Sequence, residues 1–230
     1  MQLADLEKLN EARRARRAAM LITDLGTGES LVEVEGENIR PDLREAIDKA
    51  YRTGKSGVLE TADGRRLFLN VQVPPPRIVV IGAVHISQAL AGMAEIAGFD
   101  IVIIDPRTAF ATEERFAGID LVADWPEDVL RDRPLDAYTA LVAVTHDPKI
   151  DDYPIMAAIK AGAFYVGALG SRKTHAKRVE RFLTAGLAET DIARIDAPIG
   201  LDIGAQSPAE IAVAVLGAII QAFRKREIGR

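Results

Sequence analysis

A short glycine-containing loop is the first segment of the chain with residues suited to a nucleotide-like ligand. The loop Gly82-Ala83-Val84-His85 follows an apolar run, the place where a parallel-sheet protein carries its dinucleotide loop. Gly82 permits the tight turn, but Val84 stands where a second glycine would let a pyrophosphate approach, and Ser87 replaces the third glycine. We therefore expect NAD(P) to bind poorly. The free N–H groups at the start of the following helix still favour an anion.

An acidic and a basic residue follow the next apolar run. Asp105 comes about 20 residues after Gly82, where dinucleotide-binding proteins carry a carboxylate that bonds a ribose hydroxyl. Arg107 follows closely and could face a phosphate. The alternative is that Asp105 and Pro106 simply end the strand in a turn. The residues alone leave both interpretations open.

A histidine–aspartate pair, His146 and Asp147, precedes Pro148 after a further apolar run. Such a pair could hold a ligand, a metal or a proton in transit. The alternative is that Asp147 caps the next helix beside an incidental histidine. We favour the functional interpretation because the other histidines, His85 and His175, also fall in or just behind loops that follow strands. The chain has few histidines, and their concentration at one edge of the predicted sheet indicates a functional crevice there.

A third loop combines backbone freedom, a hydroxyl group and two cations. The segment Gly170-Ser171-Arg172-Lys173 stands between an apolar run and a predicted helix. Glycine allows unusual backbone angles, and a hydroxyl and cations at a helix start suit an oxyanion. We expect a phosphate to bind here, with Arg172 supplying a charge-assisted hydrogen bond.

A long loop with an isolated carboxylate precedes the last predicted helix. Residues 197–205 contain two glycines and Asp202. Asp202 is a candidate cofactor ligand, and the alternative is that it caps or braces the loop. No Ser-His-Asp order, carboxylate pair or metal-ligand spacing stands out, so we expect neither a catalytic residue nor a metal site.

Alternating strands and helices must position these loops. Apolar runs predict strands, and amphipathic or capped segments predict helices. The expected strands are 77–81, 99–104, 119–122, 139–145 and 164–166; the expected helices are 85–97, 112–116, 152–161, 171–186 and 208–223. This alternation predicts an α/β, Rossmann-like, doubly wound parallel sheet of five or six strands with the candidate loops at one edge.

The first third of the chain has a different pattern. The stiff segment Pro74-Pro75-Pro76 cannot join a sheet ladder, so we expect two domains, residues 1–73 and residues 77–230. Strand pairs at 18–24 with 31–35 and at 58–61 with 67–73, together with a helix at 41–52, predict a small α+β domain. No residue in this domain forms a recognisable chemical constellation.

Composition excludes several classes of protein. Of the 230 residues, 29 are Lys or Arg and 34 are Asp or Glu, and the net charge of -5 disfavours nucleic acid as a partner. The absence of cysteine excludes disulfides, thiolate nucleophiles and sulfur metal ligands, and it fits a cytoplasmic protein. The most apolar window, 211–220, is too short to span a bilayer, so we expect no membrane partner.

Residues 77–225 resemble the carboxyl-terminal Rossmann-like domain of the XdhC/CoxI family, the xanthine dehydrogenase accessory factors. Ordered motifs carry the resemblance: the glycine–histidine loop at 82–87, His-Asp-Pro at 146–148, Leu-Gly-Ser-Arg at 169–172, Ala-Pro-Ile-Gly-Leu-Asp-Ile-Gly-Ala at 197–205 and Ser-Pro-Ala-Glu-Ile-Ala at 207–212. Together they span about 150 of the 230 residues. Several motifs in one order are far more specific than a lone glycine loop.

The resemblance implies a chaperone for the molybdenum cofactor. Such a chaperone binds molybdopterin, shields it during sulfuration and passes it to a xanthine-dehydrogenase-type or CO-dehydrogenase-type apoenzyme. The family's Gly-Gly-Cys segment has no counterpart in this cysteine-free chain. Without a thiolate, imidazole, carboxylate or contacts to the pterin must hold the cofactor. His146 and Asp147 are then the groups expected nearest the reactive end of the cofactor.

The absence of the Gly-Gly-Cys segment also affects which protein partners we expect for this chain. We expect a molybdoenzyme apoprotein as the client, and a second accessory chain or a second copy of this one to supply the missing amino-terminal half. The alternatives from other classes are an NAD(P)-dependent oxidoreductase and a non-catalytic interaction module.

Overall fold

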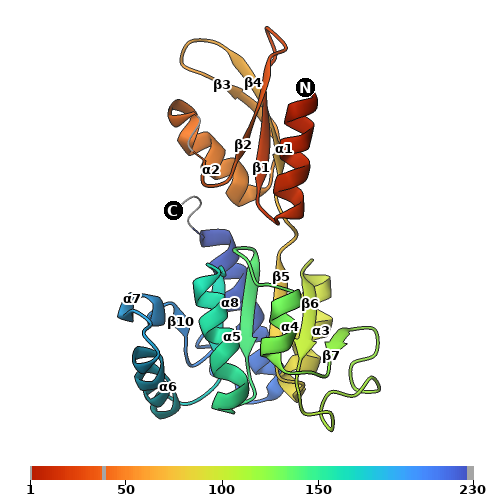
Figure 1. The fold of residues 1–230 in the computed structure, drawn as a ribbon, viewed down its shortest axis with the longest axis vertical. Coiled ribbons are helices and arrows are strands. Elements are labelled where there is room, and N and C mark those ends of the chain that lie inside the picture. The colour runs from red at the N-terminus through yellow and green to blue at the C-terminus, as the bar shows by residue number, and fades with distance from the viewer. Residues whose placement is uncertain (1, 38–39, 227–230) are drawn as a thin grey trace. The chain divides into compact units, whose positions relative to one another are not determined.

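The computed structural model describes residues 2–37 and 40–226. The chain divides into two compact units, one formed by Met1–Pro74 with Arg224–Arg230 and the other by Pro75–Phe223. Each unit has its own sheet, and the second unit carries all the candidate loops (Figure 1).

The first unit is a four-stranded antiparallel sheet with two helices. Its strands follow the order β2-β1-β4-β3. Helix α1 buries Leu9 and Ala12 against Ala19, Val32 and Val34 of the first two strands. Both predicted strand pairs and the predicted helix are confirmed. The elements are α1 (Leu3–Arg14), β1 (Ala19–Asp24), β2 (Ser30–Val34), the short 3-10 helix η1 (Pro41–Leu43), α2 (Arg44–Thr53), β3 (Gly57–Glu60) and β4 (Arg66–Gln72).

The second unit is a six-stranded parallel sheet in the order β10-β9-β8-β5-β6-β7. From β5 the chain moves outward to β6 and β7 and then returns to β8 on the other side of β5, so the predicted doubly wound sheet is confirmed. The strands are β5 (Arg77–Ile81), β6 (Asp100–Ile104), β7 (Asp120–Val122), β8 (Thr139–Ala143), β9 (Tyr165–Ala168) and β10 (Ile195–Asp196). The helices are α3 (His85–Ile96), α4 (Pro126–Asp132), α5 (Pro148–Lys160), α6 (Arg172–Thr184), α7 (Glu189–Ile192) and α8 (Pro208–Lys225).

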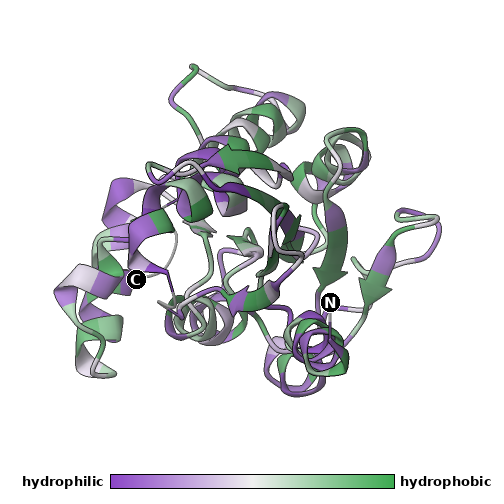
Figure 2. Ribbon diagram, turned by 90° about the horizontal axis from the view of Figure 1, so that it is seen from above, coloured by the Kyte–Doolittle hydropathy of each residue, from purple (hydrophilic) through white to green (hydrophobic). Residues whose placement is uncertain are grey.

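Helices cover both faces of the parallel sheet. Along β5, Ile78 and Val80 join the apolar cluster with α3 and α8, whereas Val79 and Ile81 join the cluster with α4, α5 and α6. Strands buried on both faces need continuous apolar runs, which is why these strands were visible in the sequence. Figure 2 shows hydrophobic residues concentrated on the strands, while the helices carry mixed faces.

One predicted helix is wrong. Residues Thr112–Phe116 form turns on the path from β6 to β7, and the Arg115 N–H donates to the Thr112 carbonyl at 3.1 Å. The Phe116 N–H likewise donates to the Glu113 carbonyl, three residues back, at 3.3 Å, so the segment makes turns rather than an α-helical i→i−4 ladder. The Arg115 guanidinium instead fixes the segment by donating to the Ala83 carbonyl at 3.1 Å.

Other differences concern element ends and short elements. Helix α5 begins at Pro148 rather than near Asp152, because Asp147 caps it and proline suits the first helical position. The sequence pattern did not predict α4, α7 or the two-residue strand β10. Across the described ranges, no helix has both the length and the apolar character needed to cross a bilayer.

Candidate functional site

The candidate loops follow β5, β8 and β9, and they share one edge of the sheet because all three strands are parallel. The prediction that His146 and Ser171 lie at the same edge is therefore confirmed. Strand order reverses between β5 and β8. Ligands of doubly wound sheets bind outside the carboxyl ends of the strands at such a reversal.

The β5 loop approaches the β8 turn very closely. Gly82 has φ +121°, and a β-carbon there would lie 2.9 Å from Thr145 Cγ2. Ser87, which stands where the dinucleotide-binding motif has its third glycine, is buried and donates its hydroxyl hydrogen to the Gly82 carbonyl. Val84 is half-buried and is the N-cap residue of α3. Its side chain makes no capping hydrogen bond to the first N–H groups of this helix.

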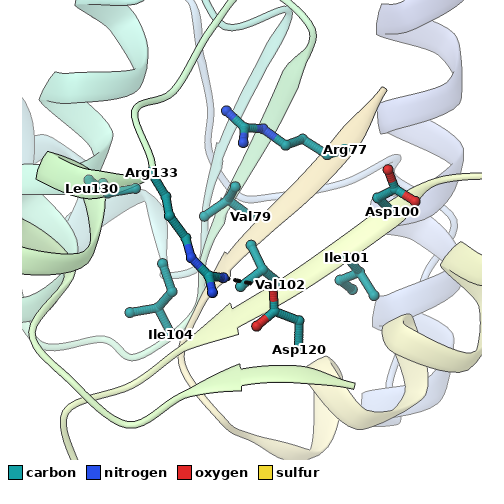
Figure 3. Close-up of a pocket in the computed structure, with 9 residues that line it drawn as sticks. All are labelled: Arg77, Val79, Asp100, Ile101, Val102, Ile104, Asp120, Leu130 and Arg133. Carbon is teal, nitrogen blue, oxygen red and sulfur yellow. Dashed lines mark hydrogen bonds and ion pairs between the residues drawn. The ribbon is translucent and has the colours of Figure 1, made fainter. Parts of the chain in front are cut away.

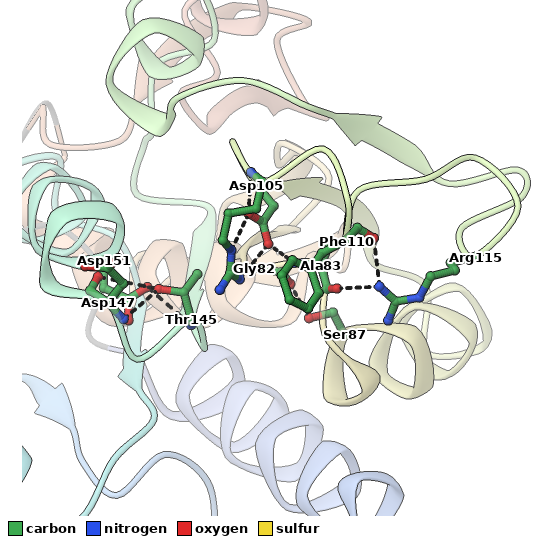
Figure 4. Close-up of polar contacts among 10 residues, drawn as sticks. Gly82, Ala83, Ser87, Asp105, Phe110, Arg115, Thr145, Asp147 and Asp151 are labelled. Atoms are coloured by element: carbon green, nitrogen blue, oxygen red, sulfur yellow. Dashed lines mark hydrogen bonds and ion pairs between the residues drawn. The ribbon is translucent and has the colours of Figure 1, made fainter.

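Asp105 is fully buried, and its carboxylate lies next to this loop (Figure 4). Its carboxylate accepts from the Ala83 N–H at 2.8 Å, the Arg107 N–H at 2.9 Å and the Arg107 guanidinium at 2.9 and 2.8 Å. Burial raises the pKa of Asp105, but the hydrogen bonds from Arg107 and Ala83 outweigh it and hold the pKa below its ordinary value. A carboxylate offers about four acceptor positions, and all are used. The structure thus supports the turn-forming alternative over a ribose ligand.

Asp151 braces the turn at the end of β8. Only 1% of this residue is exposed, and its Oδ1 accepts from the Thr145 hydroxyl at 2.7 Å and the Thr145 N–H at 3.4 Å. Its Oδ2 is buried without a hydrogen-bond partner among the described residues. Burial raises the pKa of Asp151 to about 6, against the hydrogen bonds from Thr145. The braced turn holds His146 at φ +64° with its side chain exposed.

Asp147 caps helix α5, as the structural alternative for the histidine–aspartate pair expects. Its carboxylate accepts from the Lys149 N–H at 3.0 Å, and its own N–H donates to the Thr145 hydroxyl at 3.1 Å. The imidazole of His146 is therefore exposed to solvent, whereas the carboxylate of Asp147 is already engaged as the N-cap of α5.

A pocket of about 260 Å³ opens between the start of α5 and helix α6. We call it the basic pocket; its described lining contains four cations, one histidine and no carboxylate. Arg181 pairs with Asp152 through two bonds of 2.6 and 2.9 Å. The lining residues are His146, Pro148, Lys173, Thr174, Lys177, Arg178 and Arg181.

Arg178 is the buried cation of the basic pocket. It is 3% exposed, and its Nη2 donates to the Leu169 carbonyl at 3.2 Å. Its Nε and Nη1 are buried and have no hydrogen-bond partner within the described ranges. Burial lowers the pKa of Arg178 in spite of the nearby carboxylate of Asp151. Sequence reasoning missed this residue; the available signal was a cation one helical turn before the core residue Phe182.

The glycine–serine–arginine loop lies beside this pocket. Gly170 has φ +138°, and Ser171 caps α6 by accepting from the Thr174 N–H at 3.2 Å. Arg172 is exposed and is not among the lining residues, whereas Lys173 is. The predicted oxyanion loop thus adjoins the basic pocket, but the buried cation comes from a later turn of the helix.

The family model described as the XdhC Rossmann domain matches residues 78–219. This chain belongs to the XdhC family. The match covers more than half of the chain and contains every one of the candidate loops.

Two curated relatives agree with this assignment. The chain is 34% identical over 161 residues to a Bacillus subtilis (strain 168) protein named as a probable xanthine dehydrogenase subunit; the match covers 70% of this chain and 46% of that protein. It is 27% identical over 146 residues to "Molybdenum cofactor insertion chaperone PaoD" of Escherichia coli (strain K12), covering 64% of this chain and 40% of that protein. The regions matched by this XdhC-family chain therefore span less than half the length of either relative.

A solved structure shares the fold. The crystal structure of a xanthine dehydrogenase (BH1974) from Bacillus halodurans matches with a TM-score of 0.63 and 22% identity, over 96% of this chain and 64% of that one. At this identity the likeness concerns the fold of the XdhC-family chain alone.

The loop that holds Asp202 is braced by a different carboxylate in this XdhC-family domain. Asp196 accepts from the Gly200 N–H at 3.0 Å and from the Tyr165 hydroxyl at 2.6 Å. Asp202 lies exposed farther along the same loop. The bracing role considered for Asp202 therefore belongs to Asp196.

A second cavity, of about 120 Å³, lies over the face of the parallel sheet (Figure 3). Arg77 and Asp100 begin β5 and β6, so this cavity is near the amino ends of the strands, away from the order reversal. Its Arg133 and Asp120 form an ion pair of 2.7 Å. A site at the opposite end from the reversal, with paired charges, is a weaker ligand candidate than the basic pocket.

Residues 2–37 and 40–226 contain no group of three or more His, Cys, Asp or Glu side chains that could hold a metal ion.

Proposed function

We propose that this chain is an accessory protein that binds molybdopterin and delivers the molybdenum cofactor to a xanthine-dehydrogenase-type or CO-dehydrogenase-type apoenzyme. The XdhC Rossmann domain and the similarity to a protein named as a molybdenum cofactor insertion chaperone support this proposal. The structural observation that carries it is the basic pocket at the carboxyl edge of the sheet, built around the buried Arg178.

The residues of this edge fit the organic part of the cofactor. Molybdopterin has a phosphate and a polar bicyclic ring. Nε and Nη1 of Arg178, which have no hydrogen-bond partner among the described residues, can donate to phosphate oxygens. The exposed imidazole of His146 is the candidate contact for the ring or for the reactive end. The cofactor, when bound, supplies the molybdenum chemistry of the enzyme that receives it. This chain's own residues bind and orient, and we assign none of them to catalysis.

The other candidate residues take supporting parts in this proposal. Gly82, Ala83, Val84 and His85 form the loop next to the β8 turn, which we assign to the rim of the binding surface, and Asp105 and Arg107 hold that loop in shape. We retain Gly170, Ser171, Arg172 and Asp202 as rim residues of the binding surface. The cytoplasm is the compartment in which we place this activity.

The client molybdoenzyme apoprotein is the main partner in this proposal. A second accessory chain, or a second copy of this one, would supply what the longer relatives carry outside the matched region. Because the chain has no cysteine, sulfur contacts to the metal would come from the pterin itself, from the client or from that second chain.

Cofactor retention and enzyme activation test the proposal. The chain purified from a molybdenum-replete host should carry a pterin, detectable by fluorescence after oxidation, and should raise the activity of a molybdenum hydroxylase apoenzyme. His146→Ala should reduce both, whereas Lys160→Ala, which removes a cation at the far end of α5, should change neither. A protein that carries no pterin and gives no activation would leave the interaction-module alternative.

A further inference from the structure

We propose that the basic pocket is a phosphomonoester site in which Arg178 is the buried anchor and Lys177 is the exposed clamp. This inference rests on the proposed function and deepens it, because it assigns the phosphate of the pterin to a defined place. The chemistry is shared by any dianionic phosphate monoester. It differs from the expectation that Arg172, at the start of α6, holds this group.

The state of Arg178 carries the proposal. A guanidinium is always charged, and burying one costs free energy unless its N–H groups are hydrogen-bonded. Arg178 is 3% exposed, yet within the described residues only its Nη2 has a hydrogen-bond partner, the Leu169 carbonyl at 3.2 Å. Nε and Nη1 lack partners in the described part of the chain, and the residue lines the pocket. Nε and Nη1 lie on different sides of the guanidinium, so each offers its own N–H donor, and a phosphate oxygen can accept a charge-assisted hydrogen bond from such a donor.

The charges around Arg178 favour a dianion. Lys173 and Lys177 lie four residues apart on α6, so they share one face of the helix and both line the pocket. None of the described lining residues is acidic, although the whole chain has a net charge of -5. The basic pocket is thus positively charged although the chain as a whole is negatively charged.

Neighbouring carboxylates do not satisfy Arg178. Asp152 makes a two-bond pair with Arg181, and it is occupied there. Asp151 attracts Arg178 electrostatically, but its buried Oδ2 has no hydrogen-bond partner within the described residues. The buried Nε and Nη1 donors of Arg178 are therefore the groups that a further acceptor, such as a phosphate oxygen, would complete.

The size of the basic pocket suits a phosphate ester. Its volume of about 260 Å³ exceeds that of several water molecules, each of which takes about 30 Å³ in the liquid. His146, on the rim, adds an exposed imidazole that can donate to a phosphate oxygen or contact the esterified group. Phosphate and the first atoms of its ester can therefore be held together.

Calorimetric titration of the full chain with phenyl phosphate and with inorganic phosphate tests this site. We expect Lys177→Ala and Arg178→Met to weaken phenyl phosphate binding about tenfold to a hundredfold, the range for a lost charge-assisted hydrogen bond. Arg178→Lys should recover part of the affinity, and circular dichroism would verify that each variant folds. Lys160→Ala, also an exposed helical lysine, is the matched control and should stay within about twofold of wild type.

Three outcomes would overturn the proposal: no phenyl phosphate binding by the wild type, equal binding in Lys177→Ala, or an equal loss in Arg172→Ala. The last would place the anion at the start of α6. Inorganic phosphate as tight as phenyl phosphate would assign the pocket to free phosphate instead of an ester. If phenyl phosphate follows the expected pattern while Lys177→Ala still retains pterin and activates an apoenzyme fully, the pocket stands and its link to the proposed function fails.

Discussion

The Thr145 hydroxyl donates a 2.7 Å hydrogen bond to Oδ1 of the buried Asp151, and this bond ties the end of β8 to helix α5. The intervening turn carries His146, which is exposed between these two anchors. A hidden carboxylate thereby sets the position of a surface imidazole. The stability of the turn must then depend on the charge of Asp151.

Replacing Asp151 with asparagine should change how stability depends on pH. The pKa of Asp151 is raised from 3.8 to about 6, so folding disfavours its ionised form. The stability that the protonated form provides is present below the unfolded pKa and is lost as pH rises through about 6. The free energy of unfolding of wild type relative to Asp151→Asn should therefore fall by up to about 3 kcal/mol between about pH 4 and pH 7.

Urea denaturation of the two proteins at several pH values measures this difference. Comparing wild type with the variant cancels the titration of groups that they share. A difference that is constant with pH would show that Asp151 titrates normally in the folded protein.

Gly82→Ala should destabilise the second unit more than an ordinary glycine substitution. The new β-carbon would lie 2.9 Å from Thr145 Cγ2 at φ +121°, so either the β5 loop or the β8 turn must shift. We expect a loss of about 2–4 kcal/mol in the free energy of unfolding. Gly98→Ala is the control, because Gly98 also has positive φ, +79°, but open space around it, and about 1 kcal/mol is expected. Equal losses in thermal or urea unfolding would show that the contact at Gly82 has no steric consequence.

Asp105→Ala should lower stability strongly. The change leaves the buried Ala83 N–H and the Arg107 guanidinium without their acceptor. We expect a loss of about 2–4 kcal/mol in the free energy of unfolding, because the buried Ala83 N–H loses its acceptor and the half-buried Arg107 loses its partner. Asp120→Ala, which breaks the exposed pair with Arg133, should cost less than about 1 kcal/mol in the same urea titration. A loss at Asp105 no larger than at Asp120 would contradict the role assigned to the carboxylate.

NAD and NADP should not bind tightly. Val84 occupies the approach of a pyrophosphate, and the acceptor positions of Asp105 are already used by Ala83 and Arg107. For the same reason Val84→Gly alone should not create a tight site. Calorimetry with NAD, NADH, NADP and NADPH tests this expectation. Stoichiometric micromolar binding of any of the four by wild type would contradict it and support the oxidoreductase alternative.

The parallel sheet was predictable from the sequence because strands buried on both faces leave continuous apolar runs. The shared edge of His146 and Ser171 followed directly, since both residues come after parallel strands. Arg178 was not predictable, because its burial depends on how α6 docks on the sheet. A cation on a helix is normally solvated, and only the tertiary arrangement shows that this one is not.

Roles within loops were also beyond the sequence. Asp196 and Asp202 flank Gly200, and the fold shows that it is Asp196 that accepts from the Gly200 N–H and the Tyr165 hydroxyl. Asp105 had two interpretations until its hydrogen-bond partners were known. Side-chain partners that come from distant parts of the chain decide such cases, and local spacing carries no information about them.

His146 adopts φ +64°, a conformation that costs a residue with a β-carbon about 1 kcal/mol and that glycine adopts freely. A search for heat-resistant variants of this chain should therefore favour glycine at position 146. The same change would remove the imidazole from the rim of the basic pocket. Thermal stability and ligand binding therefore make opposite demands on this residue. Selection for higher stability at position 146 would lower ligand affinity, and selection for affinity would keep the less stable backbone conformation.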